Sequence, residues 1–588
     1  MCGIAGWVEP GGATVDEASV RAMTRALAHR GPDGEGLHLE PGCGLGHRRL
    51  SLIDLPGGWQ PVSNEDGTVW VVANSEVYNY RELHRDLVAR GHCLRSSGDT
   101  EILAHLYEES GERCVESLTG MYAFALWDRA SRTLLLARDR FGIKPLYYTI
   151  DARGGLRFAS ELRALLVPPG VDRRLDFTAL HGYLRDLTVP EPRTVYRSVR
   201  KLPAAHVLIW RDGEIEVRRY WELGERDELQ VDDGEAEAEL EARIVESTAL
   251  SLRSDVPIGL FLSGGLDSSV LAWAMSQAGA EPLRTYSVSF AEPLFDESAY
   301  SRAVAVALGT EHREFRVSAD DATDTALQLV EWFDEPFADS SAIPTSMLSR
   351  EVRRDVKAVL SGEGADELFA GSGWHTGEQR DGLAELLAPP ARVVFGEESM
   401  RQSLSAEIQP ELGAESAADV ARLAADAPAG LDPLHRQLHV DLRGYLASDL
   451  LTKVDRMSML HSLEVRVPYL NHPLAEWVWR LPAACKRRGE VRKHLLRQIA
   501  ERRLPAIIAE RAKQGFAIPM DAWIWAPGRF RDAIYDTLRS RPCRERGIFA
   551  TAGVEAMLDD HDRLRELHGH RLWTLFVLER WLQRWATS

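Results

Sequence analysis

The first part of the chain alternates short apolar runs with amphipathic stretches. The runs are rich in β-branched and aromatic residues, which predicts strands, and the longer stretches have helical periodicity. The predicted strands are residues 69–73, 122–127, 133–137 and 147–150, and the predicted helices are 15–28 and 101–109. This alternation predicts stacked sheets with helices outside them.

A polar stretch at residues 222–235 interrupts the apolar periodicity and is typical of a linker. Beyond it, a buried strand at 256–262 runs through Ser-Gly-Gly into a helix at 268–278, which is the opening of a doubly wound α/β unit. Further strands are expected at 284–290 and 356–360. Helices dominate from residue 434 and end in an amphipathic, Trp-rich segment at 571–585, whose tryptophans we expect in the core.

Size and composition set the broad class. The chain has 588 residues, more than the roughly 250–300 at which one core stops growing, so we expect two units, at 1–212 and 213–588. Hydrophobic residues make up 45% and aromatic residues 8%, which is globular composition. No apolar run approaches the roughly 18 residues of a membrane span, and no signal peptide is visible. A cytoplasmic location and no membrane partner are expected.

Charge and cysteine usage exclude two classes. The formal net charge is −19, from 70 Lys and Arg against 89 Asp and Glu, which disfavours nucleic acid as a partner. The acidic stretch 235–243 is interpreted as a solvated helix face. The six cysteines contain no C-x-x-C pair and indicate neither a disulfide framework nor a zinc site.

Cys2 directly follows Met1, so removal of Met1 would place a thiol and a free α-amine on one residue. The thiolate is the reactive form of cysteine, and an α-amine with a pKa of roughly 8 can accept its proton near neutral pH. Cys2 is therefore a candidate nucleophile that carries its own base.

A glycine turn follows the strand at 256–262. Residues 263–269 (SGGLDSS) lie where a strand ends and a helix begins, and backbone N–H groups at such a point attract anions. Gly264 and Gly265 allow close approach of a phosphate, and Asp267 is a hard oxygen ligand suited to Mg²⁺. No G-K-[ST] is present, so this is not a Walker A loop, and release of pyrophosphate with transfer of AMP is the favoured chemistry.

A second glycine turn, residues 360–367 (LSGEGADE), follows the strand at 356–360. Two such turns at adjacent strand ends can face one crevice of a parallel sheet. Asp366 could complete the Mg²⁺ ligands, and Glu363 could act as acid or base near a reacting carboxylate.

With Cys2 and both turns in one chain, the sequence resembles glutamine-dependent asparagine synthetase of class B along nearly all its length. The motifs that carry the resemblance are residues 29–33 (HRGPD), 48–51 (RRLS), 98–101 (GDTE), 138–147 (RDRFGIKPLY), 453–458 (KVDRMS), 463–468 (LEVRVP) and 513–516 (KQGF). The implied fold class is α/β: an N-terminal αββα glutamine amidotransferase domain of Ntn type, then a doubly wound α/β PP-loop domain with a helical C-terminal part.

In the first half, the resemblance implies that Cys2 attacks the side-chain amide of glutamine. Arg49 would hold the glutamine carboxylate, and Glu76 with Asp99 its α-amino group. Asn74 and the backbone N–H of Ser75 would form the oxyanion hole.

In the second half, the resemblance implies an ATP and Mg²⁺ site that forms an acyl-adenylate and pyrophosphate. The implied adenosine contacts are Leu262, Val288, Ser361 and Gly362, and the implied pyrophosphate contacts are Ser263, Gly265, Ser268 and Ser269. Asp267 and Asp366 would hold Mg²⁺, and Lys493 would neutralise charge at the adenylated carboxylate. Because ammonia is largely protonated in neutral water, we also expect an apolar channel between the two sites.

Three departures from the family pattern stand out. Ser75 replaces a usual glycine, and it would be strained if that position needs a positive φ. Residues 371–374 (GSGW) and 469–471 (YLN) also differ, and we expect both near the synthetase crevice.

The leading hypothesis is amidation of aspartate to asparagine. The alternative keeps the chemistry but uses another carboxylic acid, and a substituted glutamyl amide such as a hydroxamate as nitrogen donor. Ser372 and the Ala-rich segment 384–430 motivate this alternative. A non-catalytic scaffold is disfavoured because nucleophile and metal ligands are both intact. A homodimer is expected only because two-fold dimers are common among enzymes.

Overall fold

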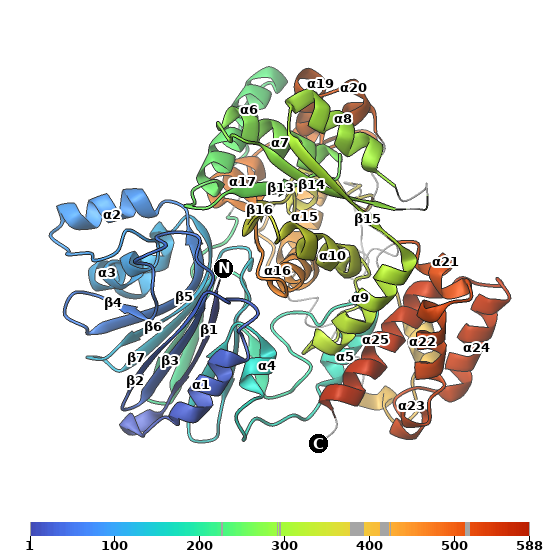
Figure 1. Ribbon diagram of the computed structural model, residues 1–588, viewed down its shortest axis with the longest axis horizontal. Coiled ribbons are helices and arrows are strands. Elements are labelled where there is room, and N and C mark those ends of the chain that lie inside the picture. The colour runs from blue at the N-terminus through green and yellow to red at the C-terminus, as the bar shows by residue number, and fades with distance from the viewer. Residues whose placement is uncertain are drawn as a thin grey trace.

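A computed structural model describes residues 2–224, 227–290, 292, 296–376, 393–411, 423, 425–511, 515 and 518–586. Figure 1 shows an N-terminal β-sandwich beside a mixed unit, with a helical bundle at the C-terminal end of the chain. Most of the family motif at 513–516 and much of the Ala-rich segment 384–430 lie outside the described residues.

The N-terminal unit contains two six-stranded antiparallel sheets. The first has the order β10 (Val199–Lys201), β8 (Tyr147–Ile150), β9 (Leu156–Ala159), β1 (Gly3–Val8), β3 (Cys43–Arg49), β2 (Gly34–Glu40). The second has the order β12 (Glu214–Arg219), β11 (His206–Arg211), β7 (Thr133–Arg138), β6 (Gly120–Asp128), β5 (Val69–Val77), β4 (Val62–Ser63).

The alternation of side chains along β5 explains the layers. Val72 points to the core between the two sheets, where it joins Ile4 of β1, whereas Val71 and Ala73 point to the other face. That outer face is covered by α3 (Glu101–Ser110) and α2 (Tyr80–Ala89). Helices α1 (Glu17–Arg25) and α4 (Leu162–Leu165) pack on the first sheet. The predicted αββα arrangement is confirmed.

The second unit is built on a five-stranded parallel sheet. Its order is β15 (Glu311–Val317), β14 (Arg284–Phe290), β13 (Ile258–Phe261), β16 (Ala358–Leu360), β17 (Glu464–Arg466). The helices between β13 and β16 are α7 (Leu266–Gln277), α8 (Ser298–Leu308), α9 (Ala319–Trp332) and α10 (Ala342–Val352), and α6 (Asp233–Ser251) precedes the sheet. The strand order reverses between β13 and β16, which is where ligands bind in open α/β sheets. The predicted doubly wound unit is confirmed.

The rest of the chain is mainly helical, as expected. The helices are α5 (Phe177–Asp186), α11 (Ala365–Phe369), α13 (Glu397–Ser403), α15 (Pro433–Arg443), a π-helical segment (Leu446–Leu451), α16 (Thr452–Met459), α17 (His472–Trp479), α18 (Ala483–Lys486), α19 (His494–Arg503), α20 (Ala506–Glu510), α21 (Met520–Trp525), α22 (Arg529–Leu538), α23 (Arg541–Arg546), α24 (Thr551–Asp562) and α25 (Gly569–Trp585); β18 (Arg487–Arg488) and β19 (Val491–Arg492) form a small hairpin. Trp573 and Trp581 of α25 are buried in the core. None of the described helices combines the length and apolar character needed to cross a bilayer.

The connection between the units follows β12. This strand pairs with β11 along its whole length, so the first unit's sheet continues past residue 212, the boundary expected from the sequence. Between β12 and α6 none of the described residues is in a helix or strand.

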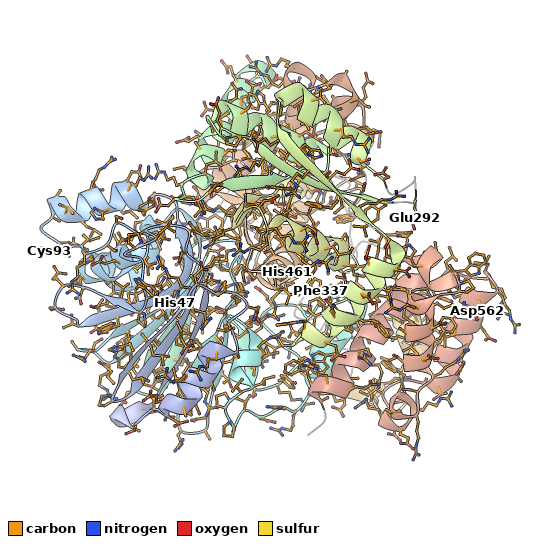
Figure 2. The ribbon with its side chains drawn as sticks, viewed as in Figure 1. His47, Cys93, Glu292, Phe337, His461 and Asp562 are labelled. Carbon is orange, nitrogen blue, oxygen red and sulfur yellow. The ribbon has the colours of Figure 1, made fainter. Side chains whose placement is uncertain are left out.

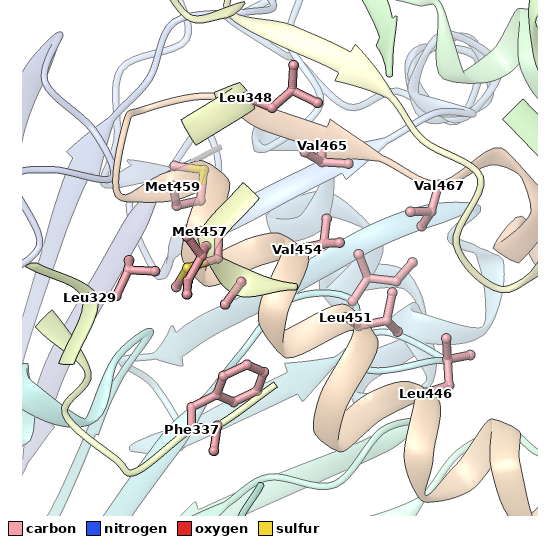
Figure 3. Close-up of a cluster of buried hydrophobic side chains, with 14 of the residues drawn as sticks. Leu329, Phe337, Leu348, Leu446, Leu451, Val454, Met457, Met459, Val465 and Val467 are labelled. Atoms are coloured by element: carbon pink, nitrogen blue, oxygen red, sulfur yellow. The ribbon is translucent and has the colours of Figure 1, made fainter. Parts of the chain in front are cut away.

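One buried apolar cluster spans both units. Figure 3 shows its part on α16 and β17, including Val454, Met457 and Val465. Met121 and Ile143 of the N-terminal unit belong to the same cluster. Charged side chains are buried at this interface too: Arg30, 0% exposed, donates two hydrogen bonds to the Asp455 carboxylate, at 2.8 and 3.1 Å. The described interface is therefore partly apolar and partly ionic, and a continuous apolar channel stays a prediction.

Candidate active sites

The first candidate site surrounds Cys2 at the inner end of β1. A narrow cavity of about 40 Å³ is lined by Cys2 together with Arg49, Ser75, Glu76 and Asp99, and the loop at 53–60 forms one of its walls. Five of the six predicted residues thus line one cavity, and the sixth, Asn74, is hydrogen-bonded to Cys2.

Backbone contacts fix Cys2. Its N–H donates to Asn74 Oδ1 at 2.9 Å, and its carbonyl accepts from Arg30 Nε at 3.1 Å. Burial raises the pKa of the Cys2 thiol. Asn74 is fully buried, and its Nδ2 has no hydrogen-bond partner within the described part of the chain. Since buried donors are almost always satisfied, this N–H group suits an oxygen that develops charge during a reaction.

The charged residues around the cavity are held by other parts of the protein. Arg49 donates from Nη2 to the Asp54 carbonyl at 2.7 Å and from Nη1 to the Leu55 carbonyl at 3.2 Å, which orients its guanidinium. Asp99 accepts from the Val77 N–H at 3.0 Å, and burial raises the pKa of its carboxyl. Glu76 Oε2 lies 2.7 Å from Arg466 Nη2 of β17, so the second unit supplies a cation beside the first site.

Ser75 is not strained in the way its replacement of a glycine suggested. It lies inside β5, opposite Tyr122, and is not among the residues with positive φ. A serine fits this backbone because extended conformations need no glycine. Its hydroxyl donates to Asp99 Oδ2 at 3.3 Å.

The second candidate site is a cavity of about 910 Å³ at the carboxyl ends of β13 and β16. These strands are parallel neighbours, so the loops that follow them leave the sheet at the same edge. Gly264 (φ +72°) and Gly364 (φ +87°) adopt left-handed conformations, and a Cβ on either would overlap a neighbour, Tyr300 and Ser301 for Gly264 or Leu470 for Gly364. Both glycines are therefore required by the packing of the loops.

Two carboxylates converge on one cation in this cavity. Lys493 Nζ lies 2.6 Å from Asp267 Oδ2, 2.7 Å from Asp267 Oδ1 and 2.6 Å from Asp366 Oδ1. Glu363 lines the same cavity, and its Oε2 has no hydrogen-bond partner among the described residues.

Most of the predicted ATP contacts line this cavity, and two do not. Leu262, Ser263, Gly265, Asp267, Ser268, Val288, Ser361 and Gly362 are part of its wall. Gly264 is covered by Tyr300 and Ser301, and Ser269 is fully buried. Neither therefore lies at the cavity surface.

Of the two departures from the family pattern expected near this cavity, one lines it and the other does not. Ser372, Gly373 and Trp374 line the cavity, with Trp374 Nε1 donating to Asp441 Oδ2 at 2.6 Å. Tyr469 and Asn471 do not line it: the Tyr469 hydroxyl donates to the Asp267 carbonyl at 3.1 Å, and the Asn471 amide binds Ser247 and Ser251. The side chains of Tyr469 and Asn471 are therefore used in contacts within the protein and not at the cavity surface.

Sequence reasoning missed several charged residues of this cavity. Lys453 belongs to the motif at 453–458, for which the resemblance implied no function. It lines the cavity and donates to Asp339 Oδ2 at 3.1 Å and Ser341 Oγ at 2.9 Å. Glu367 is buried beside Asp366, and burial together with that neighbour raises its pKa to about 8. The run of two acids at 366–367 was the available signal for Glu367.

Known protein families match both halves of the chain. The family model described as "Asparagine synthase" matches residues 239–583, and the model "Glutamine amidotransferase domain" matches residues 1–221. Asparagine synthetase [glutamine-hydrolyzing] 1 of Bacillus subtilis is 31% identical over 99% of this chain and 96% of its own. Asparagine synthetase [glutamine-hydrolyzing] 3 of the same organism is 34% identical over 88% of this chain and 87% of its own.

More distant matches are also found. Asparagine synthetase B of Escherichia coli is 28% identical over 84% of this chain and 78% of its own. A solved glutamine phosphoribosylpyrophosphate amidotransferase of B. subtilis is 14% identical, with a TM-score of 0.30 over 54% of this chain and 91% of that chain. With a family model over more than half of its length and relatives above 30% identity along nearly all of it, the chain belongs to the asparagine synthase family.

Proposed function

We propose that this protein is a glutamine-hydrolysing asparagine synthetase, which uses ATP to convert aspartate to asparagine with release of AMP and pyrophosphate. The observation that carries the proposal is the cavity at Cys2: a thiol at the second position faces a guanidinium, two carboxylates and an unsatisfied amide donor. A cavity with two carboxylates and a lysine lies at the ends of β13 and β16 in the same chain.

In the first site, Cys2 Sγ would bond to the side-chain carbonyl carbon of glutamine. The α-amine, free once Met1 is removed, would take the thiol proton, and the carbonyl oxygen would become an oxyanion that accepts from Asn74 Nδ2 and the Ser75 N–H. Cleavage of the C–N bond, with proton transfer to the leaving nitrogen, releases ammonia and leaves a thioester that water hydrolyses. Arg49 would bind the glutamine α-carboxylate and Asp99 its ammonium.

In the second site, a carboxylate oxygen of the acceptor would attack the α-phosphorus of ATP and displace pyrophosphate. The Ser263 and Ser268 hydroxyls, the loop N–H groups and the start of α7 are suited to bind the pyrophosphate oxygens. Ammonia would then attack the acyl carbon, and AMP would leave.

The residues present fit a divalent cation. The Asp267 and Asp366 carboxylates both reach one position, the Lys493 ammonium, so they can both reach a metal there. When bound, Mg²⁺ would offset the phosphate charge. The Lys493 ammonium, in the same cavity, would neutralise charge at the acceptor carboxylate.

The test compares nitrogen donors. Purified protein is supplied with ATP, Mg²⁺, aspartate and either glutamine or ammonium, and asparagine and pyrophosphate are measured. We expect both donors to work for wild type, and Cys2→Ala to keep ammonium-dependent synthesis while losing that with glutamine.

Cys93→Ser is the matched control because the Cys93 thiol is exposed and lines neither cavity. Unchanged glutamine hydrolysis in Cys2→Ala would contradict the role of Cys2. Pyrophosphate release that is independent of aspartate but stimulated by another carboxylic acid would contradict the acceptor. Intact mass of the wild-type protein reports removal of Met1.

A further inference from the structure

Four side chains outside both cavities gather their ligand atoms within 4.8 Å of one another. Glu65 comes from the loop after β4, His92 from the loop after α2, and His105 and Glu108 from α3. His105 is fully buried, whereas Glu65 and Glu108 keep 39% and 30% of their side chains exposed. The cluster is thus anchored in the protein and open to solvent on one side.

The contacts around His105 are not explained by hydrogen bonding alone. Its Nδ1 lies 3.1 Å from His92 Nδ1, 3.1 Å from Glu65 Oε2 and 3.2 Å from Glu108 Oε2. An N–H on this nitrogen could point at only one of these three atoms. The two remaining atoms would then direct lone pairs at His105 Nδ1 without receiving a hydrogen bond from it.

The same distances match the edges of a tetrahedral coordination shell. Zinc binds imidazole nitrogen and carboxylate oxygen at about 2.0–2.1 Å, which places neighbouring ligand atoms about 3.3 Å apart. Four of the six separations among these ligand atoms are 3.1, 3.1, 3.2 and 3.6 Å, the last between His92 Nδ1 and Glu108 Oε2, and all six are within 4.8 Å. One cation at the centre could accept an electron pair from each atom.

One outer partner is that of a metal-binding histidine: His92 Nε2 lies 2.9 Å from Glu109 Oε1. A carboxylate on the far nitrogen orients the ring and keeps the near nitrogen free of a proton. His105 Nε2 lies 3.8 Å from Glu101 Oε1, which is too far for a hydrogen bond. Glu108 is oriented as well, because its other oxygen accepts from Asn64 Nδ2 at 2.9 Å.

We propose that Glu65, His92, His105 and Glu108 bind one divalent transition-metal ion with tetrahedral geometry and four protein ligands. Zn²⁺ is the ion that this ligand set suits best. Two imidazoles and two carboxylates suit zinc better than Mg²⁺ or Ca²⁺, which prefer oxygen ligands alone. The absence of cysteine pairs in the sequence does not bear on this site, since it uses no cysteine.

The position of the site gives it a structural role. The chain between His92 and Glu101 leads to Asp99 in the cavity of Cys2, and Glu101 accepts from the Arg95 and Ser96 N–H groups at 2.8 and 2.6 Å. A metal on His92 and His105 would tie the start of this segment to α3. It would therefore hold the cavity wall from outside, without contact with substrate.

The test is direct metal binding to the full chain. Protein stripped with a chelator is titrated with Zn²⁺ against a chromophoric competitor, in millimolar Mg²⁺ so that the Asp267–Asp366 site is not available. We expect one Zn²⁺ per chain with a dissociation constant below about 1 µM. Co²⁺ in place of Zn²⁺ should give the intense visible bands of tetrahedral coordination.

His92→Gln and Glu65→Gln each remove one ligand at a partly exposed position, and both should weaken Zn²⁺ binding at least about tenfold. Glu109→Gln, which removes only an outer partner, should weaken it as well. Cys93→Ser, the neighbour of His92 at the outer edge of the N-terminal unit (Figure 2), and His84→Gln on α2 are matched controls that should bind as wild type does.

Failure of the wild type to bind Zn²⁺, unchanged binding in both ligand variants, or an octahedral Co²⁺ spectrum would overturn the proposal. An equal loss of binding in Cys93→Ser would overturn it too. Because the readout is metal binding, these outcomes are independent of whether the protein makes asparagine.

Discussion

Lys493 contacts both carboxylates that meet in the second cavity. It has a left-handed backbone (φ 53°) directly before α19, a conformation that costs a side chain about 1 kcal/mol. Its ammonium lies between Asp267 and Asp366, so the strained backbone places a cation where two carboxylates meet.

We predict that Lys493→Met lowers pyrophosphate formation by about 10²-fold, because a fixed charge at the reacting carboxylate is lost. Glutamine hydrolysis at Cys2 should stay within twofold of wild type, an expectation checked by assaying glutamate release in parallel. Lys357→Met is the control, since that lysine pairs with Asp33 at the unit interface, outside the cavity. Equal loss in both variants would contradict the prediction.

Glu367 gives a second prediction, on pH. Burial and the neighbouring Asp366 raise its pKa from 4.5 to about 8. The folded protein therefore holds a proton that the unfolded chain releases above about pH 4.5, so stability falls as pH rises from there to about 8. Glu367→Gln, which is neutral at every pH, should gain thermal stability relative to wild type as pH increases from 5.5 to 8.5 without Mg²⁺. A difference in Tm that does not change with pH would argue against this assignment.

At the scale of elements, the end of α11 must approach α19 closely. Gly371 follows α11, and a Cβ there would overlap Asp366 Oδ1 and Lys493 Cε. The nearest atom to a Cβ on Gly373, two residues on, would be Arg492 Nη1 at 3.8 Å. A methyl group at the first position would therefore displace these two side chains, whereas one at the second position has room.

Gly371→Ala is therefore expected to displace the Asp366–Lys493 pair and to lower pyrophosphate formation about 10²-fold, whereas Gly373→Ala should keep near wild-type turnover. Circular dichroism and Tm of both variants would show that the fold is kept. Similar turnover in the two variants would mean that the close approach of α11 and α19 is not needed.

Helices and strands with a clear pattern of apolar residues could be predicted from the sequence. A strand defined only by its hydrogen bonds to a neighbouring strand could not. The predicted strand 147–150 coincides with β8, and the helix predicted at 268–278 is α7 (Leu266–Gln277). β12 was missed because its residues are exposed at a sheet edge, so that only its hydrogen bonds to β11 define it. The site residues of the two cavities came from motifs. The Glu65 and His92 cluster has no motif, because its ligands meet only in the folded chain.

At the scale of the whole molecule, the two units are joined by buried charge. Arg30 and Lys144 of the first unit both pair with Asp455 of α16, at 2.8 Å and 3.4 Å, and all three side chains are at most 2% exposed. The partners are 425 and 311 residues apart in the chain, so no local pattern could indicate the pairs. Breaking such a pair leaves a charge without compensation in the interior.

We expect Asp455→Asn to lower the free energy of unfolding by about 3–5 kcal/mol. Asp33→Asn removes the partly exposed pair with Lys357 at the same interface and should cost about 0–1 kcal/mol. Urea denaturation of both variants provides the measurement. Because Arg30 also binds the Cys2 carbonyl, Asp455→Asn should impair synthesis with glutamine more than with ammonium. Equal stability of the two variants would contradict the assignment.

The buried position of Cys2 beside Arg30 also determines where a tag can be attached to the protein. Cys2 is buried and its carbonyl accepts from Arg30, so a peptide fused ahead of Cys2 would have to leave from a buried position. It would also block the α-amine that serves as base. An affinity tag or fluorescent partner therefore belongs after α25, which ends at Trp585 near the edge of the molecule, and a protein tagged in front would be purified as an enzyme dependent on free ammonia.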